Sequence, residues 1–285
     1  MSARLRGIAQ DTEKIVAAGE YTTGAGAVVR IADAVAEARA GTRLYGPEPV
    51  PVALPDGAAA RTGTAVVTVT GESSLDAARR MTTARPEPVA VLDFASARNP
   101  GGGYLNGAQA QEEAVCRASA LYACLTEVPE FYAHHRADRD VFYTDRVIHA
   151  PGVPVFRDDT GRLLDAPYRV GFLTSPAPNA GVIARTTPER VALIPAALAS
   201  RAERVLEVAA AHGYRRLVLG AWGCGVFQND PAQVAEAFGA ALTGRFAAAF
   251  DEVVFAVLDR TRGAATRSAF ERVLAPAAAH GQRQP

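Results

Sequence analysis

Short apolar segments that alternate with helical ones restrict the fold of this chain more than any other feature. Three of these segments are rich in β-branched residues and show no strict polar alternation: Thr64–Thr70 (TAVVTVT), Val89–Phe94 (VAVLDF) and Val253–Leu258 (VVFAVL). Shorter strand candidates are Val147–Val155, Arg169–Thr174 and Leu217–Gly220. Strands of this composition are typically buried on both faces, so they predict a mixed or parallel sheet inside the molecule.

The segments between these strands carry the pattern of helices. Ser73 or Ser74 precedes the first of them as a candidate N-cap. The expected helices are Leu75–Thr83, Gln109–Leu125, Pro188–His212 (whole, or broken at Pro195), Pro231–Phe250 and Thr266–Leu274. Strands that alternate with helices predict an α/β fold in three layers, in which helices cover both faces of a mixed central sheet.

The N-terminal part of the chain has a different pattern. Two helices are expected there, Leu5–Gly19 and Ile31–Ala40, and a Pro-, Gly- and Ala-rich stretch without periodicity follows from Tyr45 to Arg61. We therefore expect a helical N-terminal extension over residues 1–63 and one larger α/β domain over residues 64–285.

Composition excludes several classes of protein. The chain has 30 basic and 30 acidic residues, and this balance argues against nucleic-acid binding through a broad basic face. We expect neither a signal peptide, since the first residues lead into a polar stretch, nor a membrane span, which requires roughly 18 uninterrupted apolar residues. Its three cysteines, Cys116, Cys124 and Cys224, lack paired spacing, so we expect a cytoplasmic protein without disulfides and without a metal site.

Two glycine-rich loops follow predicted strands and precede predicted helices. They are Ser96–Tyr104, which contains Gly101-Gly102-Gly103, and Gly220–Phe227. Glycine lets backbone N–H groups approach an anion closely, and a helix N-terminus favours negative charge. The pair therefore indicates a diphosphate-binding site at the carboxyl edge of the sheet, although each loop alone is also compatible with a simple tight turn. Neither loop has the spacing of a Walker A or a dinucleotide-binding motif.

Glu112 and Glu113 open the helix after the triple-glycine loop. Acidic residues in a first turn often do no more than complement the helix dipole. Adjacent helical residues, however, point about 100° apart, so two neighbouring carboxylates cannot perform the same task. Beside a glycine-rich loop, one of them can reach a scissile bond while the other binds hydroxyl groups.

The run Asn99-Pro100-Gly101-Gly102-Gly103 followed by Gln111-Glu112-Glu113 resembles the signature of poly(ADP-ribose) glycohydrolases. Gly223–Phe227 is similar to the second phosphate loop of macrodomains, and Arg6–Thr12 with Gly19–Tyr21 resembles the N-terminal extension of the bacterial branch. The resemblance thus covers nearly the whole chain. It implies a macrodomain-like catalytic domain, no cofactor, and poly(ADP-ribose), ADP-ribose and poly(ADP-ribosyl)ated proteins as partners.

The same resemblance implies roles for individual residues. Glu113 would be the general acid and base that hydrolyses a ribose–ribose bond, and Glu112 would anchor a ribose. The other residues expected to bind substrate are Asn99, Gly101, Gly102, Gly103, Gln111, Gly223, Gly225, Val226 and Phe227. Glu72 and Ser73 follow the first strand, where macrodomains commonly recognise adenine, but a plain helix cap is the preferred interpretation of these two residues.

Two alternatives share this pocket. One is a macrodomain that binds ADP-ribose without hydrolysing it, and the other is a hydrolase of mono-ADP-ribosylated substrates. A paired acid next to the anomeric carbon would serve no purpose in a pure binding module, so the Gln-Glu-Glu motif favours an enzyme. Exo- and endo-cleavage are not distinguished by the sequence.

Overall fold

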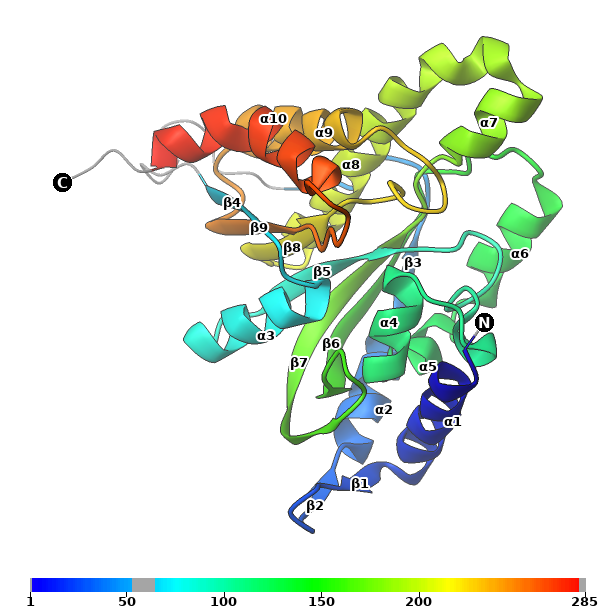
Figure 1. Ribbon diagram of the computed structural model, residues 1–285, viewed down its shortest axis with the longest axis vertical. Coiled ribbons are helices and arrows are strands. Elements are labelled where there is room, and N and C mark those ends of the chain that lie inside the picture. The colour runs from blue at the N-terminus through cyan, green and yellow to red at the C-terminus, as the bar shows by residue number, and fades with distance from the viewer. Residues whose placement is uncertain (1, 53–64, 282–285) are drawn as a thin grey trace.

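A mixed sheet forms the centre of the molecule (Figure 1). The computed structural model describes residues 2–52 and 65–281, and within them seven strands pair in one sheet. Their order is β3 (Arg43–Tyr45), β6 (Val147–Arg157), β7 (Leu163–Ser175), β5 (Val89–Phe94), β8 (Arg216–Gly220), β9 (Glu252–Ala256) and β4 (Val66–Thr70). The strands from β7 to β4 are parallel, and β6 is antiparallel to both of its neighbours. The predicted α/β fold with a mixed sheet is confirmed.

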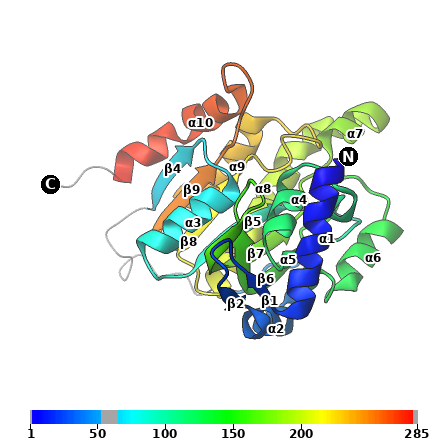
Figure 2. The ribbon, with the colours of Figure 1, turned by 60° about the horizontal axis from the view of Figure 1, so that its bottom comes forward.

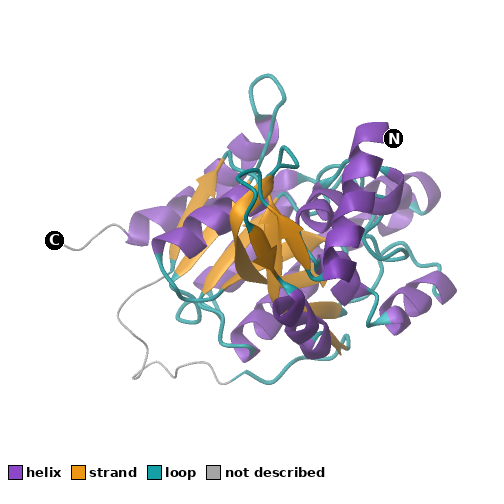
Figure 3. Cartoon of the chain, turned by 90° about the horizontal axis from the view of Figure 1, so that it is seen from below, coloured by secondary structure: helices purple, strands orange, loops and turns teal. Residues whose placement is uncertain are grey.

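Each face of the sheet is covered by helices, which makes three layers (Figure 3). One apolar core contains α8 (Ile194–Ala211), α9 (Pro231–Thr243) and α10 (Ala265–Gly281). The other contains α1 (Ala3–Ala18), α2 (Ala32–Gly41), α3 (Ser74–Ala84), α4 (Gln111–Ala118), α5 (Leu121–Leu125) and α6 (Pro129–Ala137). Beyond the sheet lie α7 (Ala180–Thr186) and the 3₁₀ turn Pro188–Leu193.

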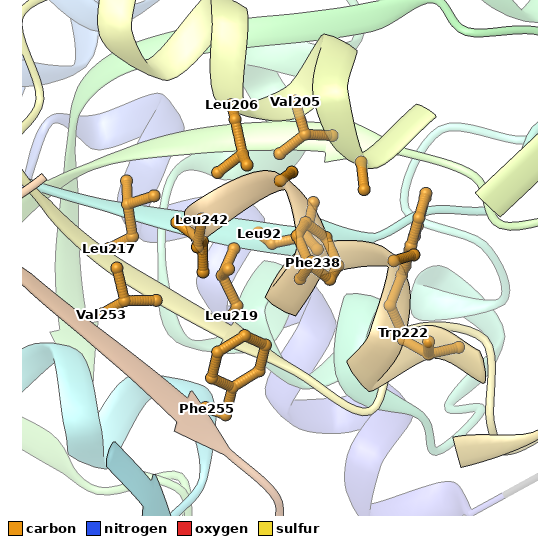
Figure 4. Close-up of a cluster of buried hydrophobic side chains, with 14 of the residues drawn as sticks. Leu92, Val205, Leu206, Leu217, Leu219, Trp222, Phe238, Leu242, Val253 and Phe255 are labelled. Atoms are coloured by element: carbon orange, nitrogen blue, oxygen red, sulfur yellow. The ribbon is translucent and has the colours of Figure 1, made fainter. Parts of the chain in front are cut away.

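The central strands belong to both cores at once, which explains their uninterrupted apolar sequences. In β5, Ala90 and Leu92 point to the core of α8 and α9, while Val89 and Val91 point to the opposite core. Figure 4 shows Leu92 with Trp222, Phe238 and other buried side chains of the first core. Because successive side chains of a strand alternate between faces, a strand covered on both sides needs apolar residues at every position.

The helix expected over Gln109–Leu125 is in fact two helices, so that prediction was wrong. Ser119 between α4 and α5 has extended backbone and forms a bridge with Val155 of β6. The N–H of Ala120 donates to the carbonyl of Pro154 at 3.1 Å. Pairing with a neighbouring strand thus interrupts a segment whose helical periodicity is continuous.

The predicted end of another helix also needs correction, since α9 ends at Thr243 and not at Phe250. The break predicted near Pro195 is present, because a 3₁₀ turn precedes α8 there.

The described part of residues 1–63 is more than a helical extension. Helix α1 begins at its N-cap Ser2 and ends at Gly19, which adopts φ 72°. A hairpin of β1 (Glu20–Thr22) and β2 (Val28–Arg30) follows, and β3 then joins the edge of the large sheet by pairing with β6. Sequence reasoning missed these three short strands. The predicted boundary between residues 63 and 64 lies outside the described residues, so the division into two domains stays a prediction.

Gly171 in β7 offers a test of how closely the sheet and the segment between α8 and β8 are packed. A Cβ atom at this buried position would lie 2.5 Å from Cζ of Tyr214, whose hydroxyl contacts Nε2 of His149 at 3.0 Å. We expect Gly171→Ala to lower the free energy of unfolding by about 1–3 kcal/mol, because Tyr214 must move in a filled core. The measurement is urea denaturation.

Gly7→Ala is the matched control for this prediction. Gly7 lies in exposed helix α1 and has no heavy atom within 4 Å of a built Cβ, so alanine should raise the free energy of unfolding by about 0.5–1 kcal/mol. Equal stability of Gly171→Ala and the wild-type protein would contradict the packing argument.

Candidate active site

The two glycine-rich loops lie at the carboxyl ends of neighbouring parallel strands. Residues 95–110 follow β5, and residues 221–230 connect β8 to α9. This edge of an α/β sheet is where ligands normally bind, because helix N-termini and loop N–H groups face it. The predicted placement of the two loops side by side on one sheet is therefore observed.

The triple-glycine segment folds as a series of tight turns beneath the two glutamates. The N–H of Gly102 donates to the carbonyl of Asn99 at 3.0 Å, and the N–H of Tyr104 donates to that of Gly101 at 3.0 Å. Gly102 adopts φ 58°, and a Cβ there would lie 2.6 Å from Oε1 of Glu113 and 3.0 Å from Oε2 of Glu112. Glycine is required because the backbone presses directly against both carboxylates.

Each carboxylate is oriented by one backbone N–H of this loop. The N–H of Gly103 donates to Oε1 of Glu113 at 2.8 Å, and the N–H of Ser96 donates to Oε2 of Glu112 at 2.7 Å. Glu112 is 3% exposed and Glu113 is 8% exposed. Among the described residues, Oε1 of Glu112 and Oε2 of Glu113 have no hydrogen-bond partner. One oxygen of each glutamate is thus held in place, while the other is buried and unpaired.

A third carboxyl group, which sequence reasoning missed, lies behind these two. Asp93 is fully buried near the end of β5, and Oγ1 of Thr174 donates to its Oδ2 at 3.0 Å. Burial raises the pKa of Asp93 to about 7. Burial, together with the nearby charge of Asp93, also raises the pKa of Glu112 well above its usual range. An aspartate inside the otherwise apolar run VAVLDF was the signal for this group.

Gln111 links three elements beneath the site. Its Oε1 accepts from the N–H of Phe94 at 2.9 Å, and its Nε2 donates to the carbonyl of Leu92 at 2.8 Å and to Oγ of Ser74 at 3.2 Å. The side chain therefore fixes the start of α4 to β5 and α3. Its expected contact with substrate stays a prediction, since these bonds occupy both ends of the amide.

The second loop is anchored by a buried tryptophan and a buried asparagine. Nε1 of Trp222 donates to the carbonyl of Ser175 at 2.8 Å, and Nδ2 of Asn229 donates to the carbonyl of Pro178 at 2.8 Å. Gly223 adopts φ 69°, and a Cβ there would lie 2.5 Å from Nδ2 of Asn229. The base of the loop is thus rigid, and it fixes the position of the tip.

The tip of this loop contains the predicted ligand residues Gly225, Val226 and Phe227. Gly225 is exposed with open space around it, and Val226 is 79% exposed. The ring of Phe227 lies 5.9 Å from that of Tyr143, a residue that sequence reasoning did not single out. Tyr143 adopts φ 58°, a conformation that is rare for a bulky residue and that often marks a functional position.

Tyr143 also contacts the first loop, because the guanidinium of Arg98 lies 5.9 Å from its ring centre. Arg98 directly precedes Asn99, which is exposed. The structure thus brings Asn99, the glycine segment and Phe227 to the same edge of the sheet, with Tyr143 between the two loops. Nothing in the sequence around Tyr143 indicates this placement.

The two residues proposed for adenine recognition have structural partners. Oγ of Ser73 accepts from the N–H of Asp76 at 3.0 Å and caps α3. The carboxylate of Glu72 accepts two hydrogen bonds from Arg80, at 2.8 and 2.7 Å, and this pairing lowers the pKa of Glu72. Ser73 is therefore a helix cap, as the simpler interpretation held, and an adenine contact by either residue stays a prediction.

Helix α1 lies beside the segment that carries Glu112 and Glu113 (Figure 2). The hydroxyl of Tyr104, just after the glycines, lies 2.9 Å from Oε1 of Glu13. Oγ1 of Thr12 donates to the carbonyl of Arg117 in the last turn of α4 at 2.7 Å. Both ends of the segment that carries Glu112 and Glu113 are therefore attached to the N-terminal helix.

Three further properties concern only the part of the chain that the structure describes. There, no group of three or more His, Cys, Asp or Glu side chains is arranged to hold a metal ion. None of the described helices is long and apolar enough to cross a membrane. Cys116, Cys124 and Cys224 are free thiols.

Comparison with known proteins shows the family. The model of the microbial-type poly(ADP-ribose) glycohydrolase (PARG) catalytic domain matches residues 9–158. The PARG from Thermomonospora curvata bound to the inhibitor ADP-HPD is 54% identical, with 95% of this chain and 99% of that chain covered and a TM-score of 0.85. A second structure of the T. curvata enzyme is 51% identical over 95% of this chain and 100% of that chain, with a TM-score of 0.89.

A more distant structure agrees with these two. PARG from Deinococcus radiodurans in complex with ADP-ribose is 46% identical, with 86% of this chain and 98% of that chain covered and a TM-score of 0.78. No curated protein sequence matches the chain.

The fold and the matching structures define a glycosidase built on a macrodomain-like fold. The chain belongs to the microbial-type poly(ADP-ribose) glycohydrolase family. The resemblance seen in the sequence is thereby confirmed, and an enzyme that releases ADP-ribose is favoured over a pure binding module.

Gly102→Ala tests whether the glycine contact positions the glutamates. We expect at least about a 100-fold loss of ADP-ribose release from poly(ADP-ribose), because a small misplacement of a catalytic group has effects of this size. Gly24→Ala is the control, since Gly24 lies between β1 and β2 and a Cβ there meets nothing within 4 Å. Release rates and circular dichroism would be measured together. Full activity of Gly102→Ala would show that the carboxylates tolerate displacement.

Asp93→Asn tests how much the burial of the Asp93 carboxyl lowers the free energy of unfolding. The pKa of Asp93 is raised in the folded state, so wild-type stability should fall as pH rises from about 4 through about 7. We expect Asp93→Asn to be more stable than wild type at pH 8, on the order of 1–3 kcal/mol, with little difference at pH 4. Urea unfolding at several pH values gives the answer. Lower stability of Asp93→Asn at pH 8 would mean that the structure needs a charged Asp93.

Proposed function

We propose that the protein hydrolyses the ribose–ribose O-glycosidic bond of poly(ADP-ribose) with Glu113 as both general acid and general base. The observation that carries this proposal is the pair of adjacent buried glutamates, each held by one loop N–H and each with one oxygen available. Related enzymes were crystallised with the inhibitor ADP-HPD and with ADP-ribose, which supports ADP-ribose as the unit that this site binds.

Glu113 is suited to proton transfer by its position. Its Oε1 is occupied by the N–H of Gly103, so Oε2 is the atom that would protonate the leaving ribose oxygen. The C–O bond then breaks through an oxocarbenium-like state. The resulting carboxylate accepts a proton from the water that attacks the anomeric carbon, and this restores the acid.

Glu112 is suited to a different task. It lies deeper than Glu113, and burial raises its pKa. Its one available oxygen, Oε1, would accept a hydrogen bond from a ribose hydroxyl and hold the sugar beside Glu113. The two neighbouring glutamates would thus divide binding and catalysis between them.

The two loops would enclose the rest of the ADP-ribose unit. Gly223, Gly225 and Val226 would surround the diphosphate, because the loop is fixed at its base and precedes the N-terminus of α9. Phe227 would cover the distal ribose, and Asn99 would bind it from the other loop. Poly(ADP-ribosyl)ated proteins in the cytoplasm would be the source of the polymer.

Substitution of each glutamate by glutamine tests these roles. We expect Glu113→Gln to lower ADP-ribose release by about 100- to 10,000-fold, since it removes the proton donor, and to retain ADP-ribose binding. Glu112→Gln should weaken ADP-ribose binding as well as release. Chromatography quantifies the product, and calorimetry measures the affinity for ADP-ribose.

Glu37→Gln is the matched control, because Glu37 is an exposed residue of α2 paired with Arg169. Its activity should equal that of the wild-type protein. Tight ADP-ribose binding by wild type without any release would instead favour a reader or a hydrolase of mono-ADP-ribosylated substrates.

A further inference from the structure

Three arginines without acidic partners lie together beside the first loop. Nη1 of Arg136 donates to the carbonyl of Arg98 at 2.7 Å, and Nη2 of Arg98 donates to the carbonyl of Arg139 at 3.4 Å. Among the described residues, none of the three forms a salt bridge. Nearby acids are already engaged, since Asp140 pairs with Arg190 and Asp145 pairs with Arg201. The positive charge of this cluster is therefore not neutralised by ion pairs within the protein.

Two other acids belong to the same surface, and neither forms an ion pair in the described structure. Asp138 is exposed and accepts the N–H of Asp140 at 2.9 Å through Oδ1, and Glu130 is exposed in the first turn of α6. Arg146 lies nearby, because it donates to Oγ1 of Thr144, which in turn contacts Nε2 of His135. The surface keeps a local excess of arginine although the chain as a whole has no net charge.

The cluster adjoins the site on the side of the loop that carries Asn99. Arg98 is the residue before Asn99, whose carbonyl accepts the N–H of Gly102, and Gly102 touches Glu113. The guanidinium of Arg98 lies over the ring of Tyr143, which contacts Phe227. Arg98 is thus connected to the glutamates through the first loop, and Arg136 and Arg139 lie beside Arg98.

The leaving group of this reaction is itself a polyanion. Cleavage of poly(ADP-ribose) between two riboses separates the terminal unit from the next ADP-ribose unit, which carries a diphosphate of its own. That unit must extend from the scissile bond past the residues around Glu113. Arginine binds phosphate oxygens through several donors at once, so several arginines close together suit a diphosphate.

We propose that Arg98, Arg136 and Arg139 bind the diphosphate of the ADP-ribose unit on the leaving-group side of the scissile bond. This inference rests on the proposed function, because it takes the terminal unit to occupy the site described above. It gives the enzyme a preference for polymer over a single ADP-ribose unit, and it makes polymer binding depend on salt more steeply than monomer binding.

Binding to the Glu113→Gln protein tests the inference without hydrolysis of the probe. Arg136→Gln and Arg139→Gln would be combined in that background, and the affinities for poly(ADP-ribose) and for ADP-ribose measured at several salt concentrations. We expect the Kd for polymer to rise about tenfold and its salt dependence to flatten by about one to two counterions, while the Kd for ADP-ribose changes less than about twofold. Arg136→Lys with Arg139→Lys should recover part of the loss.

The matched control replaces two other exposed arginines without described acidic partners, Arg43 of β3 and Arg272 of α10. This double variant removes the same amount of positive charge from other elements of the fold. It should leave the affinities for poly(ADP-ribose) and for ADP-ribose unchanged. An equal loss of polymer affinity in this control would overturn the inference in favour of general charge. An equal loss for monomer and polymer in the Arg136/Arg139 variant would overturn it as well, since the arginines would then only support the terminal-unit site.

Release of ADP-ribose by the wild-type protein is measured separately. Its absence would refute the proposed hydrolysis, whereas the contrast between polymer and monomer binding would still decide the role of the arginines.

Discussion

The contact between the backbone of Gly102 and Gly103 and the carboxylates of Glu112 and Glu113 is the constraint on which the site depends. The N–H of Gly103 orients Glu113, and no side chain fits between Gly102 and either carboxylate. The rest of the surrounding structure holds these partners together. Gln111 fixes α4 to β5, Tyr104 and Thr12 attach the segment to α1, and the sheet supports it from below. The positions of the two glutamate carboxylates are therefore determined mainly by the packed backbone around them.

The site also contains three buried carboxyl groups close together, an arrangement that is unfavourable for the stability of the fold. Asp93, Glu112 and Glu113 come from one strand end and one helix start, and burial opposes ionisation of the first two. Such an arrangement lowers stability at neutral pH and is retained where a reaction needs carboxyl groups in a dry environment. The free energy that the two apolar cores contribute allows the fold to tolerate it.

The features that could be predicted from the sequence are those determined by neighbouring residues in the chain. Buried strands such as Val89–Phe94, the two glycine loops and the acidic pair were recognisable from composition and spacing, and the PARG family followed from the motif. Features set by distant contacts were not recognisable: the break at Ser119 arises from pairing with β6, and the position of Tyr143 beside Phe227 depends on how the loops meet. The attachment of α1 to Tyr104 was missed for the same reason, because Glu13 and Tyr104 are far apart in the chain.

The position of β4 at one edge of the sheet has a consequence for how the protein is made. Val66 of β4 pairs with Glu252 of β9, so the partner of this strand leaves the ribosome long after β4 itself. Until then an apolar, β-branched segment has no neighbour, and unpaired strands of this kind associate with other chains. Contacts this distant in sequence also slow folding. A cell that expresses the enzyme strongly would therefore need chaperones for the nascent chain more than for the finished protein.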